Sequence, residues 1–165
     1  MSSCGVAKPR PSLMTTKLTL EIAARICHSV VAMSKAQKWA PVSVVVIDSS
    51  DNILCSMLMD GCPPVAYPKY AHAKATTAVS LGISSRKFRD KYIGGPEKVA
   101  QGLSMIATMQ GAICCFPGSV LLSTSDGIVG AVGVSGASSD QDEFMALSAV
   151  REFDFITEPA SSPLD

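Results

Sequence analysis

The segment from Ser135 to Glu143 holds the densest group of residues that could do chemistry, a glycine bend followed by acids at a predicted helix start. Backbone amides at a helix N-terminus suit an anion, but Asp140, Asp142 and Glu143 already bring negative charge there, which disfavours a phosphate loop. One interpretation is a capping box formed by Asp140 and Glu143. The other is a ligand pocket in which Asp142 and Glu143 act as catalytic acid and base. Ser135 and Gln141 would then contact the ligand.

The two histidines of the chain, His28 and His72, are candidate ligand-binding residues. A single neutral ring nitrogen suffices to ligate a metal such as iron. His28 lies on the flank of the apolar stripe of the first predicted helix, and from the residues alone either histidine is a candidate metal ligand. His72 lies two positions before Lys74, and we assign it as a ligand contact. The alternative for both is a histidine that simply packs or is solvated at a helix flank.

Lys74 and Asp60 form a third candidate group. One interpretation is a salt link between them, since a half-buried charge usually needs a partner. In the other, Lys74 binds a carboxylate of the ligand, and Asp60 orients it. Both residues are therefore predicted to lie at the ligand site or beside it.

The sequence argues against two other kinds of site, a serine hydrolase site and a soft-metal site made of methionines. The stretch Gly133-Val-Ser135-Gly136 is not the Gly-x-Ser-x-Gly elbow of serine hydrolases, which argues against that class. The eight methionines form no cluster with histidine or cysteine, so we expect them to fill the core rather than to bind a soft metal.

The hydrophobic pattern indicates the elements that must position these residues. Apolar residues at three-and-four spacing predict a helix over 19–38, and an alanine-rich stretch with Pro68 early and Gly82 just beyond predicts another over 66–81. Small residues at 71, 75 and 78 would let that helix approach a sheet closely. The other predicted helices are 85–91, 97–109 and 138–151, and the predicted strands are 42–47, 53–59, 112–116, 120–124 and 128–134. Because strands and helices do not alternate, we predict an α+β fold with an antiparallel sheet flanked by helices.

Composition narrows the class of protein. A chain of 165 residues with 47% apolar and 17% charged residues can bury one core, so we expect one domain over 18–153 between tails at 1–17 and 154–165. Basic and acidic residues are equal at 14 each, and we expect no nucleic-acid partner. Without a long apolar run or a CxxC motif, we expect no membrane segment, a cytoplasmic location and reduced cysteines. A positive mean hydropathy with few aromatics favours a homo-oligomer.

Four sequence motifs occur together between residues 18 and 153. They are Leu18-Thr19-Leu20 at a helix start, Ile47-Asp48 followed by Met59-Asp60-Gly61, Lys74-Ala75 with Thr77-Ala78, and Gly130-Ala-Val-Gly133-Val-Ser135-Gly136 followed by Gln141-Asp142-Glu143. This combination resembles the GlcG/HbpS-like family, which includes secreted haem-binding proteins and the haem-binding C-terminal domain of some corrinoid adenosyltransferases. The resemblance implies a profilin-like single domain, homo-oligomeric assembly, and tetrapyrrole binding in some members.

The chain departs from the family pattern at two places. Leu58 stands where the family usually has arginine, and Pro117-Gly118-Ser119-Val120 replaces its usual Gly-Gly-x-Pro turn. We expect these changes to reshape the pocket and to leave the fold intact.

Three functions remain open at this point. The resemblance implies a small-molecule binding protein for haem or a related tetrapyrrole, with His28 or His72 as an axial ligand of the iron. It favours His28 as the metal ligand, because the first helix borders the ligand pocket in haem-binding members of the family. The alternative is a small-molecule enzyme of the isomerase, cyclase or lyase type, in which Asp142 and Glu143 work with the cation of Lys74. A purely structural oligomer is the third.

Overall fold

Five strands form one sheet with helices on both faces. The computed structural model describes residues 17–165. In chain order the elements are α1 (Leu20–Gln37), β1 (Ser43–Asp48), β2 (Ile53–Leu58), α2 (Ala66–Leu81), α3 (Ser85–Tyr92), α4 (Pro96–Thr108), β3 (Ser119–Thr124), β4 (Gly127–Ser135), α5 (Ser139–Val150) and β5 (Ile156–Glu158). The strand order is β2-β1-β4-β3-β5, and every neighbouring pair is antiparallel. The predicted α+β class is therefore confirmed.

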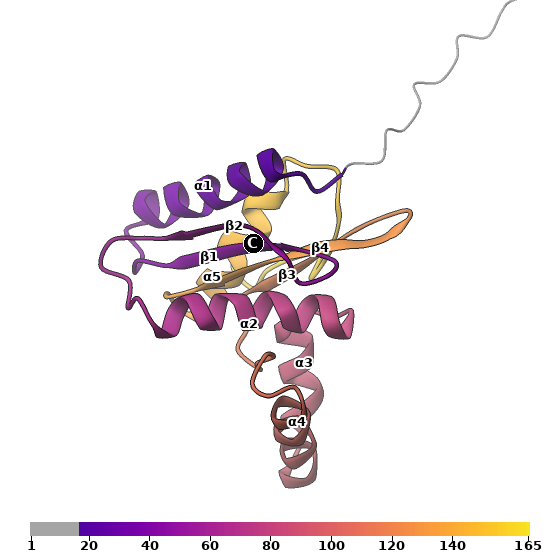
Figure 1. Cartoon of the computed structure of the whole chain (residues 1–165). Coiled ribbons are helices and arrows are strands. Elements are labelled where there is room, and N and C mark those ends of the chain that lie inside the picture. The colour runs from indigo at the N-terminus through magenta and orange to yellow at the C-terminus, as the bar shows by residue number, and fades with distance from the viewer. Residues whose placement is uncertain (1–16) are drawn as a thin grey trace, which may run out of the picture.

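The helices divide between the two faces of the sheet (Figure 1). α1 and α5 pack on one face, where they bury alternate residues of β1, β3 and β4. α2 packs on the other face through Ala71, Ala75 and Ala78, the predicted small-residue stripe. The approach is close because Gly133 of β4 lies beneath α2: a Cβ added there would stand 2.0 Å from the carbonyl oxygen of Ala71.

α3 and α4, which we call the α3–α4 arm, project away from the sheet beyond α2 (Figure 1). α4 has the predicted amphipathic pattern, yet Gly102 is its one buried residue. The apolar side chain of Leu103 is 60% exposed. None of the helices between residues 17 and 165 is long and apolar enough to cross a membrane.

The start of α5 is fixed by a capping box of different composition from the predicted one. The hydroxyl of Ser138 accepts from the amide of Gln141, and the Gln141 side chain accepts from the amide of Ser138. The predicted box of Asp140 with Glu143 is wrong, because Ser138 occupies the cap and both acids lie inside the helix with other partners.

The chain between α4 and β3 was expected to contain a strand at 112–116, and this expectation is wrong. The amide of Cys114 donates to the hydroxyl of Thr77 on α2 at 2.9 Å, so its backbone is satisfied without a neighbouring strand. The outer edge of β3 pairs instead with β5, which lies within the segment 154–165 predicted as a tail. The predicted N-terminal tail falls outside the described residues except for Lys17.

Candidate functional site

A cavity of about 210 Å³ opens where α2 meets the bend between β4 and α5. We call it the polar cavity. Its lining combines hydroxyl, charged and aromatic side chains with the glycine bend: Tyr67, Tyr70, Lys74, Phe116, Ser135, Gly136, Ala137, Ser139 and Asp142. The structure therefore brings together three residues predicted as site residues, namely Lys74, Ser135 and Asp142.

Lys74 and Asp142 form an ion pair in the wall of the polar cavity. Lys74 Nζ donates to Asp142 Oδ2 and to the carbonyl oxygen of Val134, both at 2.8 Å. Asp142 Oδ1 accepts from the amide of Ala137 at 3.0 Å. Each of the two charged side chains is only 3% exposed. Such a pair is held in one geometry because neither charge can be left without its partner.

The predicted salt link between Lys74 and Asp60 is wrong. Asp60 is exposed and follows β2, where it lines a separate cavity with Lys35 of α1. Lys74 reaches Asp142 instead because α2 crosses the sheet at Gly133, which brings its side chain to the end of β4. The proposed orienting role of Asp60 therefore concerns a different part of the surface from the polar cavity.

Gly118 makes room for the ion pair. A Cβ at this position would stand 2.7 Å from the carbonyl oxygen of Val134 and 2.8 Å from Lys74 Nζ. Its φ of +135° is also one that residues with side chains rarely adopt. The departure from the family turn at residues 117–120 thus lies against the buried pair.

Burial raises the pKa of Asp142 above its ordinary value, and Lys74 and the amide of Ala137 act in the opposite direction. A carboxyl group whose pKa is raised can hold a proton closer to neutral pH than an exposed one. Asp142 is therefore the acid of the polar cavity that could exchange a proton with a ligand.

Glu143 points away from the polar cavity, because consecutive residues of a helix differ by about 100° in direction. Its Oε1 accepts from Arg86 Nε of α3 at 2.7 Å, and Arg86 also pairs with Asp140. The Glu143 side chain is fully buried, and its Oε2 has no hydrogen-bond partner among the described residues. Burial raises the pKa of Glu143, against the effect of Arg86. The two predicted catalytic acids thus do not face one cavity, and a catalytic role for Glu143 stays a prediction.

A larger cavity of about 500 Å³ adjoins the polar cavity and is mostly apolar. We call it the apolar groove. α2 forms one wall and α4 the other, with the segment between α4 and β3 as the floor: Ala66, Lys69, Tyr70, Ala73, Leu103, Ile106, Gly111, Ile113, Cys114, Cys115 and Phe116. Tyr70 and Phe116 line both cavities, and their rings meet edge to face with centroids 5.8 Å apart.

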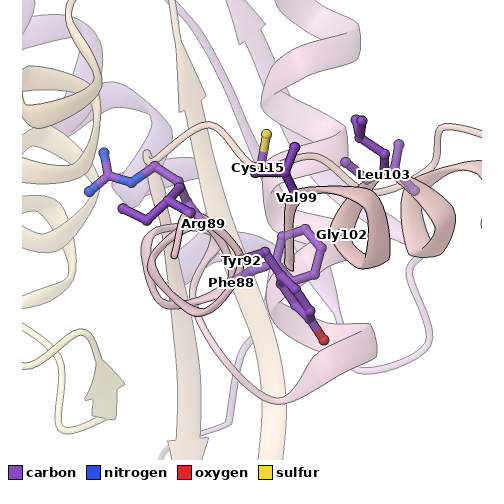
Figure 2. Close-up of a pocket in the computed structure, with 9 residues that line it drawn as sticks. Phe88, Arg89, Tyr92, Val99, Gly102, Leu103 and Cys115 are labelled. Carbon is purple, nitrogen blue, oxygen red and sulfur yellow. The ribbon is translucent and has the colours of Figure 1, made fainter. Parts of the chain in front are cut away.

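A third cavity, of about 110 Å³, lies within the α3–α4 arm (Figure 2). Phe88 and Tyr92 of α3 face α4 at Gly102, while the Arg89 side chain points away from α4. Leu103 and Cys115 line this cavity and the apolar groove as well. The inner side of α4 is therefore apolar along its length and incompletely covered.

Neither histidine lines the polar cavity or the apolar groove. His28 is exposed on α1, across the sheet from α2, with its Nδ1 2.8 Å from the carbonyl oxygen of Ala24. His72 Nε2 lies 3.2 Å from Asp51 Oδ1 in the turn between β1 and β2. Among residues 17–165 no three His, Cys, Asp or Glu side chains are placed to hold a metal ion together. Iron ligation by His28 and ligand contact by His72 stay predictions.

The remaining predicted residue, Gln141, is occupied in the α5 capping box. The aromatic residues of the site were missed from the sequence. A signal was present, because Tyr67, Tyr70 and Lys74 are spaced three and four residues apart and so share one face of a helix. Phe116 could not be found this way, since its position depends on the irregular segment after α4.

Residues 18–151 match the family described as haem degrading protein HbpS-like. No functionally curated protein matches the chain in sequence. The crystal structure of HbpS is similar with a TM-score of 0.70 at 26% identity, over 90% of this chain and 99% of HbpS. The crystal structure of a double mutant of HbpS from Streptomyces reticuli is similar with a TM-score of 0.68 at 25% identity, over 93% of this chain and 98% of the mutant. The crystal structure of the complex of PduOC with haem is similar with a TM-score of 0.76 at 21% identity, over 87% of this chain and 99% of PduOC. At this identity the similarity shows the fold.

Proposed function

This chain belongs to the HbpS-like family of haem-degrading proteins, and from that membership we propose that it binds haem or a related tetrapyrrole across the polar cavity and the apolar groove. At family level the membership connects the chain with haem-related binding. The observation that carries the proposal is that a polar and an apolar cavity meet at Tyr70 and Phe116. A ligand with an apolar body and a polar end matches that arrangement.

The residues present suit a flat apolar ring with carboxylate tails. The groove of about 500 Å³ is of the size that small-molecule sites usually have, and the aromatic rings of Tyr70 and Phe116 offer faces and edges to a planar ligand. At the polar end, Ser135 and Ser139 present hydroxyls near the start of α5. Lys69 lines the groove and supplies a cation for a second carboxylate.

Haem, when bound, supplies an iron that can exchange an electron, and the protein supplies binding and orientation. Lys74 and Asp142 hold the polar end rigid, since their charges neutralise each other. α4 covers the apolar body from one side and shields it from water through Leu103 and Ile106.

Titration with ferric haemin, followed by the Soret band, tests this proposal. We expect saturable binding, and we expect Leu103→Lys to weaken it at least tenfold, because the substitution puts a charge into the apolar groove. Ser104→Lys is the matched control, since Ser104 is the next residue of α4, is exposed and lines no cavity described above. Equal affinities for the two variants, or no saturable binding by the unmodified chain, would contradict the proposal.

The raised pKa of Asp142 in the wall of the polar cavity favours a second candidate, a small-molecule enzyme of the isomerase, cyclase or lyase type. Native mass spectrometry of the protein purified from its source would identify a retained small molecule, whose conversion can then be followed. We expect Asp142→Asn to abolish that conversion with the fold intact, as judged by circular dichroism. Unchanged conversion would remove Asp142 from the chemistry.

We also propose that the chain acts as a homo-oligomer in the cytoplasm. The apolar residues exposed on the α3–α4 arm, such as Ile93 and Leu103, support assembly, because large apolar patches usually mark contact surfaces. Light scattering coupled to size-exclusion chromatography measures the subunit number, and a monomer at micromolar concentration would contradict this proposal.

A further inference from the structure

The two cavities contain few side chains able to ligate an iron ion. The candidates are the phenols of Tyr67 and Tyr70, the carboxylate of Asp142, the thiols of Cys114 and Cys115, and the amines of Lys69 and Lys74. The two histidines lie elsewhere: His28 is on α1 across the sheet, and His72 faces Asp51. A ligand of the iron within this site therefore has to come from oxygen, sulfur or amine donors.

Several of these donors are unsuited by their contacts. Lys74 already donates to Asp142 and to the Val134 carbonyl. The Asp142 carboxylate is 3% exposed, and its two oxygens already accept from Lys74 and from the amide of Ala137. Burial raises the pKa of the Cys114 thiol, which favours the protonated form that does not bind metal. Cys115 lines the apolar groove and the cavity of the α3–α4 arm, and it does not reach the polar cavity.

Tyr70 is the donor that lines both the polar cavity and the apolar groove. Its side chain projects from α2 against Phe116, at the boundary between the two cavities, and the residue is 42% exposed. Tyr67 lines the polar cavity alone. A planar ligand whose body lies in the groove and whose tail lies in the polar cavity must pass Tyr70.

Resting on the function proposed above, we propose that the phenolate oxygen of Tyr70 is the axial ligand of ferric haem bound to this chain. In this step the phenol O–H bond breaks, the proton leaves to solvent at the open side of the cavity, and an oxygen–iron bond forms. The iron stays ferric, so no oxidant or reductant is required. Tyrosine is one of the axial ligands that haem proteins use, and its hard oxygen donor suits ferric iron.

The test is a titration of the full chain with ferric haemin in four forms: unmodified, Tyr70→Phe, Tyr67→Phe and His28→Ala. Tyr70→Phe removes one oxygen and keeps the ring against Phe116, and Tyr67→Phe makes the same change one turn earlier on α2. The readouts are the dissociation constant from the Soret band and the phenolate-to-iron charge-transfer band in the visible and resonance Raman spectra. Circular dichroism confirms that each variant is folded.

We expect the phenolate band in the unmodified chain, in Tyr67→Phe and in His28→Ala. Tyr70→Phe should lose the band and bind haemin at least tenfold more weakly, while binding stays saturable because the groove is unchanged. Saturable binding without a phenolate band, or a band that survives Tyr70→Phe, overturns the role of Tyr70 and leaves the proposed function standing. A spectrum changed by His28→Ala and unaffected by Tyr70→Phe overturns it in favour of the histidine. No saturable binding by the unmodified chain overturns both proposals.

Discussion

The junction of α2, β4 and α5 and the α3–α4 arm are built in opposite ways. At the junction two charged side chains are buried to 3% exposure and each is satisfied by a defined partner. In the arm, α4 buries only Gly102 and leaves Leu103 60% exposed. The junction is therefore fully paired within the chain itself, while the arm leaves apolar side chains uncovered. Selectivity for the polar end of a ligand and for its apolar body would come from different regions of the chain.

The largest effect should come from breaking the buried pair at the junction. Lys74→Met leaves Asp142 as a buried charge without its cation, which should lower the free energy of unfolding by about 3–5 kcal/mol in urea titrations. The double variant Lys74→Met/Asp142→Leu should recover most of this loss, because two apolar residues leave no uncompensated charge. A loss below about 1 kcal/mol for Lys74→Met would mean that water reaches the pair in solution.

A matched pair of leucines compares the two regions in packing alone. Leu122 of β3 is fully buried in the core on the face of the sheet that carries α1 and α5, so Leu122→Ala should cost about 2–5 kcal/mol of unfolding free energy. Leu103→Ala in the arm should change it by about 0.5 kcal/mol or less when the protein is dilute enough to be monomeric, since exposed positions contribute little. Thermal and urea unfolding at that dilution both measure the difference. Similar costs at the two positions in the monomer would show that Leu103 packs against the rest of its own subunit.

The sheet and most helices could be predicted because their hydrophobic periods are local. α2, for example, has an alanine-rich pattern that ends at a glycine, and its predicted and observed bounds coincide. Residues 112–116 were misassigned because five apolar or small residues in a row carry no period of their own. Their backbone follows from a contact with Thr77, far away in the sequence, which no local pattern reveals.

Three of the nine residues that line the polar cavity could likewise be predicted as site residues. Lys74, Ser135 and Asp142 belong to motifs with recognisable chemistry, so the sequence points to them directly. The choice of Asp142 over Asp60 as the partner of Lys74 depends on where α2 crosses β4, a tertiary feature set by Gly133. The apolar groove depends on the placement of α4, which has almost no buried contacts that a pattern could specify.

Gly118 at the junction and Gly111 at the end of the arm both have a positive φ, so replacing each by alanine compares the backbone of the two regions. The expected losses of unfolding free energy are smaller than those expected for Lys74→Met and Leu122→Ala. Gly118→Ala should cost about 2–3 kcal/mol, because its φ is +135° and the new Cβ would meet the Val134 carbonyl and Lys74. Gly111→Ala, at the end of the arm, has a φ of +77° and nothing within 4 Å. Backbone strain alone should then cost about 1 kcal/mol. Chemical denaturation of the two variants gives the difference in their free energies of unfolding. Equal losses would mean that the backbone around Gly118 adjusts to a new side chain as readily as the backbone around Gly111 does.

The smallest effect concerns the contact that joins the two regions, from Glu143 of α5 to Arg86 of α3. Burial raises the pKa of Glu143, so between its unfolded and folded pKa values the native state holds a proton that the unfolded chain has lost. The stability contributed by this group is therefore fully present at low pH and is lost as the pH rises through the raised value. Glutamine does not titrate, so the free energy of unfolding of the unmodified chain should fall relative to that of Glu143→Gln as the pH rises from about 4.

Glu97→Gln, at an exposed position of α4, is the control, because it measures how the loss of an exposed carboxylate changes the free energy of unfolding. Parallel pH curves for the unmodified chain and Glu143→Gln would mean that Glu143 stays ionised beside Arg86, and the arm would then be held to the junction equally at every pH.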